Sequence, residues 1–174
     1  MERTDFSQYI RNIKDYPKKG IVFRDITTLL REPYIFNEAI LKLSQFYKNI
    51  KVDKVVAIES RGFITGAALA YNLRAGFVPI RKRGKLPADV FSETYELEYG
   101  TDVIEIHKDS IHEGEHIILH DDVLATGGTM SAAVKLVKKL NPVIMGICFL
   151  IELKSLKGRE KLADYKIQSL IEFD

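Results

Sequence analysis

Short runs of apolar residues alternate along this chain with longer segments of helical spacing, and this alternation constrains the fold more than any other feature. The runs have the length and composition of strands buried on both faces of a sheet, and they are 55–58, 77–80, 117–119 and 143–151. The segments with helical spacing are 33–47, 63–73 and 128–140. Strands that alternate with helices in this way predict an α/β domain with a mainly parallel central sheet flanked by helices.

Three weaker patterns complete the expected secondary structure. Apolar side chains recur at helical spacing over 6–16, which predicts a short amphipathic helix that Pro17 stops. Residues 103–106 alternate like a half-exposed strand, and 166–173 predict an edge strand. Because neither a repeat nor a Ser/Gly linker interrupts the sequence, we expect a single domain over 1–174.

Composition narrows the cellular setting. The lone Cys148 excludes a disulfide within the chain, which suits a reducing compartment. The first twenty residues hold no apolar signal region. The longest apolar run, 143–151, is nine residues long, whereas a bilayer-spanning helix needs roughly 20. We therefore expect a cytoplasmic protein with no membrane segment.

The charge is balanced overall and unevenly distributed along the chain. Twenty-six basic and 24 acidic residues give a net charge of +2, which offers no global reason to bind nucleic acid. Residues 1–87 carry 17 basic and 8 acidic side chains (+9), and 88–174 carry 9 and 16 (−7). Charges of both signs are therefore arranged locally.

The richest chemistry follows the run 117–119, where Asp121 and Asp122 precede a loop of Gly and Thr that opens a helix. The free N–H groups and dipole of a helix start favour an anion, and glycines let the backbone approach it closely. The loop lacks both the P-loop lysine and the G-x-G-x-x-G spacing. Carboxylates hold a diol or a metal ion well, so a ribose phosphate suits the combination. A plain helix cap is the alternative interpretation.

An apolar strand running into D-D-x-x-A-T-G-G-T resembles the phosphoribosyl diphosphate motif of the type I phosphoribosyltransferase family. The resemblance implies that fold, with a small hood from about residues 1–30 plus C-terminal segments. It places Asp121 and Asp122 on the ribose hydroxyls. It places five loop residues around the 5′-phosphate: Ala125, Thr126, Gly127, Gly128 and Thr129. It further implies a homodimer. It also implies a Mg²⁺ ion that is held mainly by substrate oxygens and has no direct protein ligand, with Asp121 and Asp122 contacting the ligands of the ion rather than the ion itself.

Two further loops carry cations at expected strand ends. Four of the five residues in 81–85 are basic, which alone indicates a solvated patch or a weak nucleic-acid stretch. A leaving diphosphate gains negative charge and would need such cations. The resemblance makes Glu59, Ser60 and Arg61 the pyrophosphate loop, with a cis peptide between the first two and Glu59 where the family often has aspartate. It implies that diphosphate also contacts Arg81, Lys82 and Lys85.

Residues 87–100 contain few side chains of the buried type, so they are expected to form a structureless loop. In the family this segment is a lid that excludes water from the site. The resemblance implies that Tyr99 contacts substrate and that Glu98 exchanges a proton at purine N7. Glu98, Arg61 and Lys85 are the catalytic groups that it implies.

The segment 20–27, G-I-V-F-R-D-I-T, resembles the hood of the adenine-specific branch of the family. It implies a purine stacked on Phe23, its edge bonded to backbone groups of Val22 and Arg24, and Leu153 on the other side. Such groups discriminate bases, because a carbonyl accepts from the 6-amino group and an N–H donates to N1. The implied reaction transfers 5-phosphoribosyl from phosphoribosyl diphosphate to N9 of adenine, giving AMP and diphosphate.

Other interpretations compete with this one. Residues 112–116, H-E-G-E-H, match a zinc-protease motif that requires a helix, but Gly114 favours a polar turn instead. His107 and His120 are expected to be hydrogen-bonded structural histidines, and Cys148 a core residue. A non-catalytic regulator with the same phosphate loop is the main rival, although it would not need the cations and lid that serve diphosphate.

Overall fold

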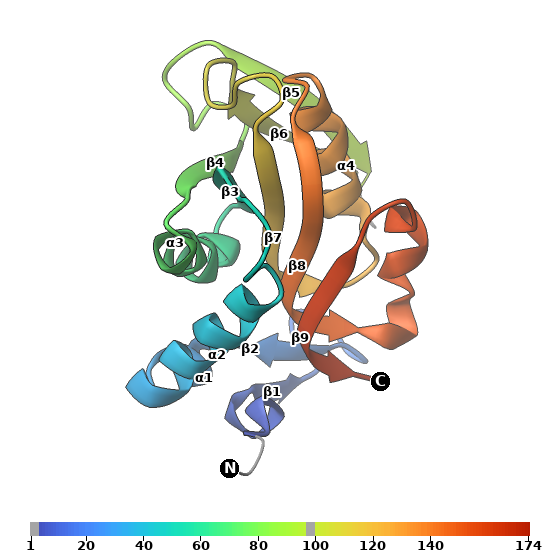
Figure 1. Ribbon diagram of the computed structural model, residues 1–174. Coiled ribbons are helices and arrows are strands. Elements are labelled where there is room, and N and C mark those ends of the chain that lie inside the picture. Colours follow the sequence, from blue (N-terminus) through green and yellow to red (C-terminus); the bar gives the residue numbers. More distant parts are fainter. Residues whose placement is uncertain (1–3, 97–99) are drawn as a thin grey trace.

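The computed structural model describes residues 4–96 and 100–174. A seven-stranded sheet in the order β5-β6-β4-β3-β7-β8-β9 forms its centre, and β1 and β2 form a separate pair (Figure 1). The strands are β1 (Arg11–Lys14), β2 (Val22–Asp25), β3 (Lys54–Ile58), β4 (Gly76–Lys82), β5 (Val90–Glu96), β6 (Thr101–His107), β7 (His116–Leu124), β8 (Val143–Leu153) and β9 (Ile167–Phe173). The α-helices are α1 (Thr27–Leu30), α2 (Pro33–Gln45), α3 (Arg61–Leu73) and α4 (Gly128–Lys138), and the 3₁₀ turns are η1 (Phe6–Tyr9), η2 (Lys154–Leu156) and η3 (Gly158–Leu162).

The prediction of a mainly parallel sheet flanked by helices is confirmed. Strands β4, β3, β7, β8 and β9 pair in parallel, and β5 and β6 add an antiparallel edge. The expected edge strand at the C-terminal end is also confirmed, because β9 pairs only with β8 in the sheet. The carboxyl ends of the parallel strands therefore lie at one edge of the sheet, where ligands of such folds bind.

The unbroken apolar runs exist because each parallel strand is covered on both faces. Successive side chains of a strand point to opposite faces, so Ile117 packs into the core beneath α4 while Ile118 packs into the core beneath α2 and α3. Both are fully buried. Figure 1 shows α4 on one face of the sheet and α2 with α3 on the other.

The expected N-terminal helix over 6–16 is wrong. Only one 3₁₀ turn forms, η1, and the chain continues as β1, in which Ile13 pairs with Phe23 of β2. Ile13 is 36% exposed and Tyr16 53% exposed, so their helical spacing does not define a buried face. Pairing with β2 satisfies the backbone hydrogen bonds that the helix would have provided.

The expectation of a structureless 87–100 segment is wrong for seven of its fourteen residues. Residues 90–96 form β5 and pair throughout with β6. β6 is more buried than its alternation predicts, because β4 and β5 flank it on both sides. Its Glu105 is only 6% exposed and accepts a hydrogen bond from the Gly84 amide at 2.8 Å. Among the residues described, no helix is both long enough and apolar enough to cross a membrane.

Candidate active site

The acidic pair lies within strand β7 rather than after it. The sequence suggests that the buried strand ends at Leu119, whereas β7 continues through Asp121 and Asp122 to Leu124. The pairing partner β8 is long enough to bond this extension, as in the register of Asp121 with Phe149. Because the two aspartates are adjacent in a strand, their side chains leave from opposite faces. Asp121 lines the hollow of the Gly-Thr loop and also lies close to Gly62 of α3, whereas Asp122 pairs with Arg61.

Asp121 borders the hollow of the Gly-Thr loop. The hollow measures about 70 Å³ and is lined by residues 123–130 with Asp121 and Phe149. Gly127 is the N-cap of α4 and, having no side chain, makes no capping bond to the first turn. The first-turn amides are therefore available to an anion in the hollow. The predicted phosphate loop has the geometry that an anion cradle needs.

Glycines hold this loop in place. Gly127 has a φ of +76°, and a Cβ there would lie 2.5 Å from the carbonyl oxygen of Gly158. A Cβ at Gly158 would in turn collide with the carbonyl oxygen of Ala125. The loop is thus wedged against the start of η3. The Gly-Thr pattern predicted the first glycine, but nothing local distinguishes Gly158 as its packing partner.

Asp122 faces Arg61, the first residue of α3. The Arg61 Nε lies 2.8 Å from the Asp122 Oδ2, and the guanidinium carbon lies 4.8 Å from the centre of the Phe23 ring. Asp122 is 6% exposed. Despite the short ion-pair distance, its Oδ2 receives no hydrogen bond of proper geometry from the described residues. The Arg61 guanidinium is therefore the charged group that faces this buried oxygen.

The two carboxyls share one electrostatic environment. Burial raises the pKa of Asp121, and the neighbouring Asp122 carboxylate raises it further. Burial also raises the pKa of Asp122, while the Arg61 guanidinium opposes that rise. The Asp121 Oδ1 accepts the Asp122 amide hydrogen at 2.8 Å. Hydroxyl groups that donate to this pair would stabilise its charged form.

The start of α3 approaches the pair closely because its residues are small. A Cβ at Gly62 would lie 2.6 Å from the Asp121 Oδ1, so only glycine fits there. One turn later, the Thr65 hydroxyl lies 2.7 Å from the Nε2 of His120, next to Asp121 in β7. The role of Thr65 was missed by sequence reasoning; small residues repeated along 62–66 are the signal that could have indicated the close contact.

Glu59 binds the loop 81–85, which we call the cationic loop. Its carboxylate accepts from the Arg81 Nε at 3.2 Å and from the Lys82 amide at 2.9 Å. The Lys82 ammonium pairs with Asp102 at 3.1 Å, and Lys85 forms no ion pair within the described residues. The expected cis peptide between Glu59 and Ser60 is confirmed. Ser60 is the N-cap of α3 and makes no side-chain capping bond, so this helix start is also open.

The predicted base-binding residues lie on two separate elements. Val22, Phe23 and Arg24 belong to β2, and Leu153 is the last residue of β8. The Phe23 ring meets the Tyr16 ring edge-on, with the ring centres 5.3 Å apart. Glu98 and Tyr99 lie outside the described residues.

The histidines divide between the surface and the core. Residues 112–115 form the expected polar turn and His116 begins β7. In the turn, the Glu115 carboxylate accepts the His112 amide hydrogen at 2.8 Å. His120 is a hydrogen-bonded core histidine as predicted, with its Nδ1 3.2 Å from the sulfur of buried Cys148. The prediction for His107 is wrong at Nε2, which is buried without a partner among the described residues. No group of three or more His, Cys, Asp or Glu side chains that could hold a metal ion occurs among the described residues.

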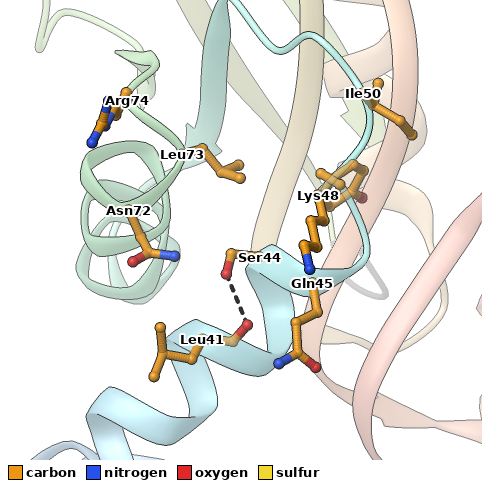
Figure 2. A pocket seen from close by; sticks show the side chains of 9 residues that line it. Leu41, Ser44, Gln45, Lys48, Ile50, Asn72, Leu73 and Arg74 are labelled. Carbon is orange, nitrogen blue, oxygen red and sulfur yellow. Dashed lines mark hydrogen bonds between the residues drawn. The ribbon is translucent and has the colours of Figure 1, made fainter.

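A second cavity, of about 400 Å³, opens between the C-terminal ends of α2 and α3 (Figure 2). It lies near the amino ends of the strands, away from the acidic pair. The Ser44 hydroxyl donates to the Leu41 carbonyl at 2.8 Å, and the side chain of Arg74 points away from Ser44. Because its charged side chains do not converge on a common point, this cavity is not a candidate active site.

Comparison with known proteins agrees with this geometry. The family model described as the phosphoribosyl transferase domain matches residues 25–174. An adenine phosphoribosyltransferase of Geobacter metallireducens is 56% identical over 169 residues, which is 97% of this chain and 99% of the relative. The chain therefore belongs to the phosphoribosyl transferase family.

Solved structures narrow the assignment within the family. The crystal structure of adenine phosphoribosyltransferase from Thermoanaerobacter pseudethanolicus has a TM-score of 0.93 and 52% identity, covering 95% of this chain and 96% of the other. The Saccharomyces cerevisiae enzyme, solved with adenine and an imino-altritol bisphosphate, has a TM-score of 0.89 and 41% identity, with 94% of each chain covered. By sequence and by structure, the chain groups with the adenine phosphoribosyltransferases.

Proposed function

We propose that this protein transfers the 5-phosphoribosyl group of phosphoribosyl diphosphate to N9 of adenine, forming AMP and diphosphate for purine salvage. The observation that carries the proposal is the acidic pair itself: Asp121 lines the hollow of the Gly-Thr loop, and buried Asp122 is paired with Arg61 at the start of α3. Ribose hydroxyls are donors that fit such a pair of carboxylates, with the 5′-phosphate at the hollow and the diphosphate at Arg61. The close similarity to adenine phosphoribosyltransferases supports adenine as the acceptor base.

In the reaction, the bond from C1′ to a diphosphate oxygen breaks and its electron pair goes to diphosphate. The N9 lone pair of adenine in its N7–H tautomer forms the new bond to C1′, and the proton on N7 passes to the Glu98 carboxylate. Arg61 and Lys85 stabilise the charge that grows on the leaving group. Glu98 exchanges a proton at purine N7 in this scheme. Orientation and electrostatics supply the catalysis, and no side chain forms a covalent intermediate.

The parts of phosphoribosyl diphosphate have separate partners. Asp121 and Asp122 accept from the ribose hydroxyls, and residues 125–129 surround the 5′-phosphate. The pyrophosphate loop 59–61, together with Arg81, Lys82 and Lys85, binds the diphosphate. Tyr99, on the lid, contacts the bound substrate.

Mg²⁺ is the proposed cofactor, and the donor set supports one held by substrate oxygens. No cluster of three protein ligands occurs in the part of the chain described, so substrate oxygens and water would supply most of the ligands, and the carboxylates of Asp121 and Asp122 would accept hydrogen bonds from water bound to the ion. When bound, Mg²⁺ neutralises charge between the ribose and diphosphate oxygens. Asp121 and Asp122 orient the ribose beside it.

Adenine stacks on Phe23 in this proposal, with Leu153 on its other side. The backbone of Val22 and Arg24 distinguishes the 6-amino purine from a 6-oxo purine, because the latter would reverse both hydrogen bonds. A buried polar group left without a partner costs binding free energy, so the wrong base is rejected.

A homodimer and a cytoplasmic location complete the proposal, with no nucleic-acid partner. The α3–β4 face supports self-association, since Ile64, Tyr71 and Phe77 are 46%, 88% and 37% exposed. Exposed apolar patches of this kind mark interaction surfaces. Light scattering after size-exclusion chromatography tests it, and Tyr71→Lys should shift a dimer toward monomer.

The decisive experiment measures diphosphate release from phosphoribosyl diphosphate and Mg²⁺ with each purine in turn. Adenine alone should support turnover. Turnover with hypoxanthine or guanine instead would overturn the base assignment. No turnover with any base would favour the regulator interpretation, in which the same loop only senses the phosphate.

A further inference from the structure

We infer that Phe173 is a positioning residue for the purine, because one aromatic ring joins the two elements that flank the proposed base site. The Arg24 guanidinium carbon lies 3.9 Å from the centre of the Phe173 ring. In the ladder between β8 and β9, Phe173 is the register partner of Leu153. The inference rests on the proposed function, which puts the purine between β2 and Leu153.

The β1–β2 pair needs such an anchor. It forms its own two-stranded sheet and shares no ladder with the seven-stranded sheet. All four residues of β1 are exposed, and in β2 only Asp25 is buried. An isolated two-stranded ribbon is at best marginally stable, so side-chain contacts must hold its backbone against the main sheet. Figure 1 shows the pair near the carboxyl end of β9.

Arg24 makes few contacts besides that ring. One terminal nitrogen of its guanidinium donates to the Asn12 Oδ1 across the β1–β2 ladder. Its Nε is buried and has no acceptor among the described residues. Asn12 belongs to the same small sheet and cannot tie it to the rest of the molecule. The Phe173 ring is therefore the contact through which Arg24 fixes β2 relative to β8.

Fixing β2 in this way matters more for the base than for the phosphoribosyl group. The backbone groups of 22–24 bond the purine edge in the proposed function, whereas Asp121, Asp122 and the Gly-Thr loop hold the other substrate. Loss of the ring frees β2 to shift relative to Leu153 and lowers the affinity for adenine. A cation over an aromatic face is worth enough to change affinity by about threefold to thirtyfold.

The test compares steady-state kinetics of Phe173→Ala, Phe173→Leu and Phe173→Tyr with those of the wild-type protein. We expect Phe173→Ala to raise KM for adenine by about tenfold, while KM for phosphoribosyl diphosphate and kcat change less than twofold. Phe173→Tyr keeps the aromatic face and should restore the wild-type KM. Phe173→Leu keeps apolar bulk beside Leu153 without the ring, so it should stay impaired.

A double-mutant cycle with Arg24→Met guards against simple misfolding. If the ring acts through Arg24, the double variant should be no worse for adenine than either single variant. Unchanged kinetics in Phe173→Ala, an equal rise of both KM values, or full rescue by leucine would each overturn the inference. A wild-type protein that fails to use adenine would refute the proposed function instead, and the two failures are therefore distinguishable.

Discussion

The Nε of Arg61 lies 2.8 Å from the Oδ2 of Asp122, and the same guanidinium lies over the ring of Phe23. One cation thus links the acid proposed for the ribose with the ring proposed for the purine. Arg61 is the first residue of α3, and this end of the helix lies against β7 because Gly62 lets it approach Asp121 closely. The arrangement places the charge for diphosphate, the acceptor for ribose and the surface for the base within reach of one small substrate pair.

Asp122→Asn should weaken the use of phosphoribosyl diphosphate strongly. The change leaves Arg61 without its charged partner, and the neutral amide offers a ribose hydroxyl a single, weaker acceptor oxygen in place of the carboxylate. We expect kcat/KM for phosphoribosyl diphosphate to fall by about tenfold to a hundredfold, measured by initial rates of diphosphate release. Glu93→Gln, which removes the ion pair of Glu93 with Lys139 outside the site, is the control and should change little. A wild-type rate in Asp122→Asn would contradict the assigned role.

Gly127→Ala and Gly114→Ala form a matched pair. Their φ values are +76° and +77°, so both variants bear a similar backbone strain of about 1 kcal/mol. Gly114 has open space around its Cβ position, whereas a Cβ at Gly127 would meet the Gly158 carbonyl oxygen at 2.5 Å. Urea denaturation should show a further loss of about 1–3 kcal/mol for Gly127→Ala only.

The same pair separates loop geometry from general stability. Gly127→Ala displaces the cradle and should raise KM for phosphoribosyl diphosphate by about tenfold, since the first-turn amides no longer converge on the phosphate. Gly114→Ala should leave that KM unchanged. Equal KM values in the two variants would show that the 127–158 contact does not shape the phosphate site.

His120 should make the folded state sensitive to mild acid. Burial lowers its pKa from 6.5 to about 4, so between these values the unfolded chain binds more protons than the folded protein. Stability is therefore full above about pH 6.5, falls as the pH drops toward 4 and levels off below. The loss at pH 5 should be about 2 kcal/mol, measured as the change in the free energy of unfolding by urea.

The variant His120→Gln tests this source of pH dependence, and the quantity to compare is the change in the free energy of unfolding between pH 7.5 and pH 5. This change should be smaller in His120→Gln than in the wild-type protein by about 2 kcal/mol. His112→Gln is the control because His112 lies exposed in the turn before β7. If the free energy of unfolding changed with pH by the same amount in His120→Gln as in the wild-type protein, the acid sensitivity would belong to other groups.

Glu59→Gln should loosen the cationic loop without abolishing activity. The Glu59 carboxylate binds both the Arg81 side chain and the Lys82 amide, and glutamine keeps one acceptor but loses the charge. We expect KM for phosphoribosyl diphosphate to rise by about threefold to tenfold, with KM for adenine unchanged. Steady-state kinetics with each substrate varied separately measures this, and an equal rise in both KM values would argue against a role confined to diphosphate.

Much of the frame was predictable from local sequence. An unbroken apolar run such as 117–119 is stable only where both faces are covered, which indicates a parallel sheet between helices. The Gly-Thr loop was readable because the requirements for an anion at a helix start are themselves local. The helix over 6–16 failed for the opposite reason: its spacing was helical, but the hydrogen-bonding partner β2 decided the outcome.

The sequence by itself thus determined the layered α/β fold, the Gly-Thr loop at a helix start and the resemblance to phosphoribosyltransferases. Only the tertiary structure decided that Arg61 meets Asp122 and Phe23, that Gly158 supports Gly127, and that Phe173 lies under Arg24. The physical reason is separation along the chain. Periodicity reports which face of an element is buried, whereas contacts between distant residues depend on strand order, register and close helix packing, which no local pattern contains.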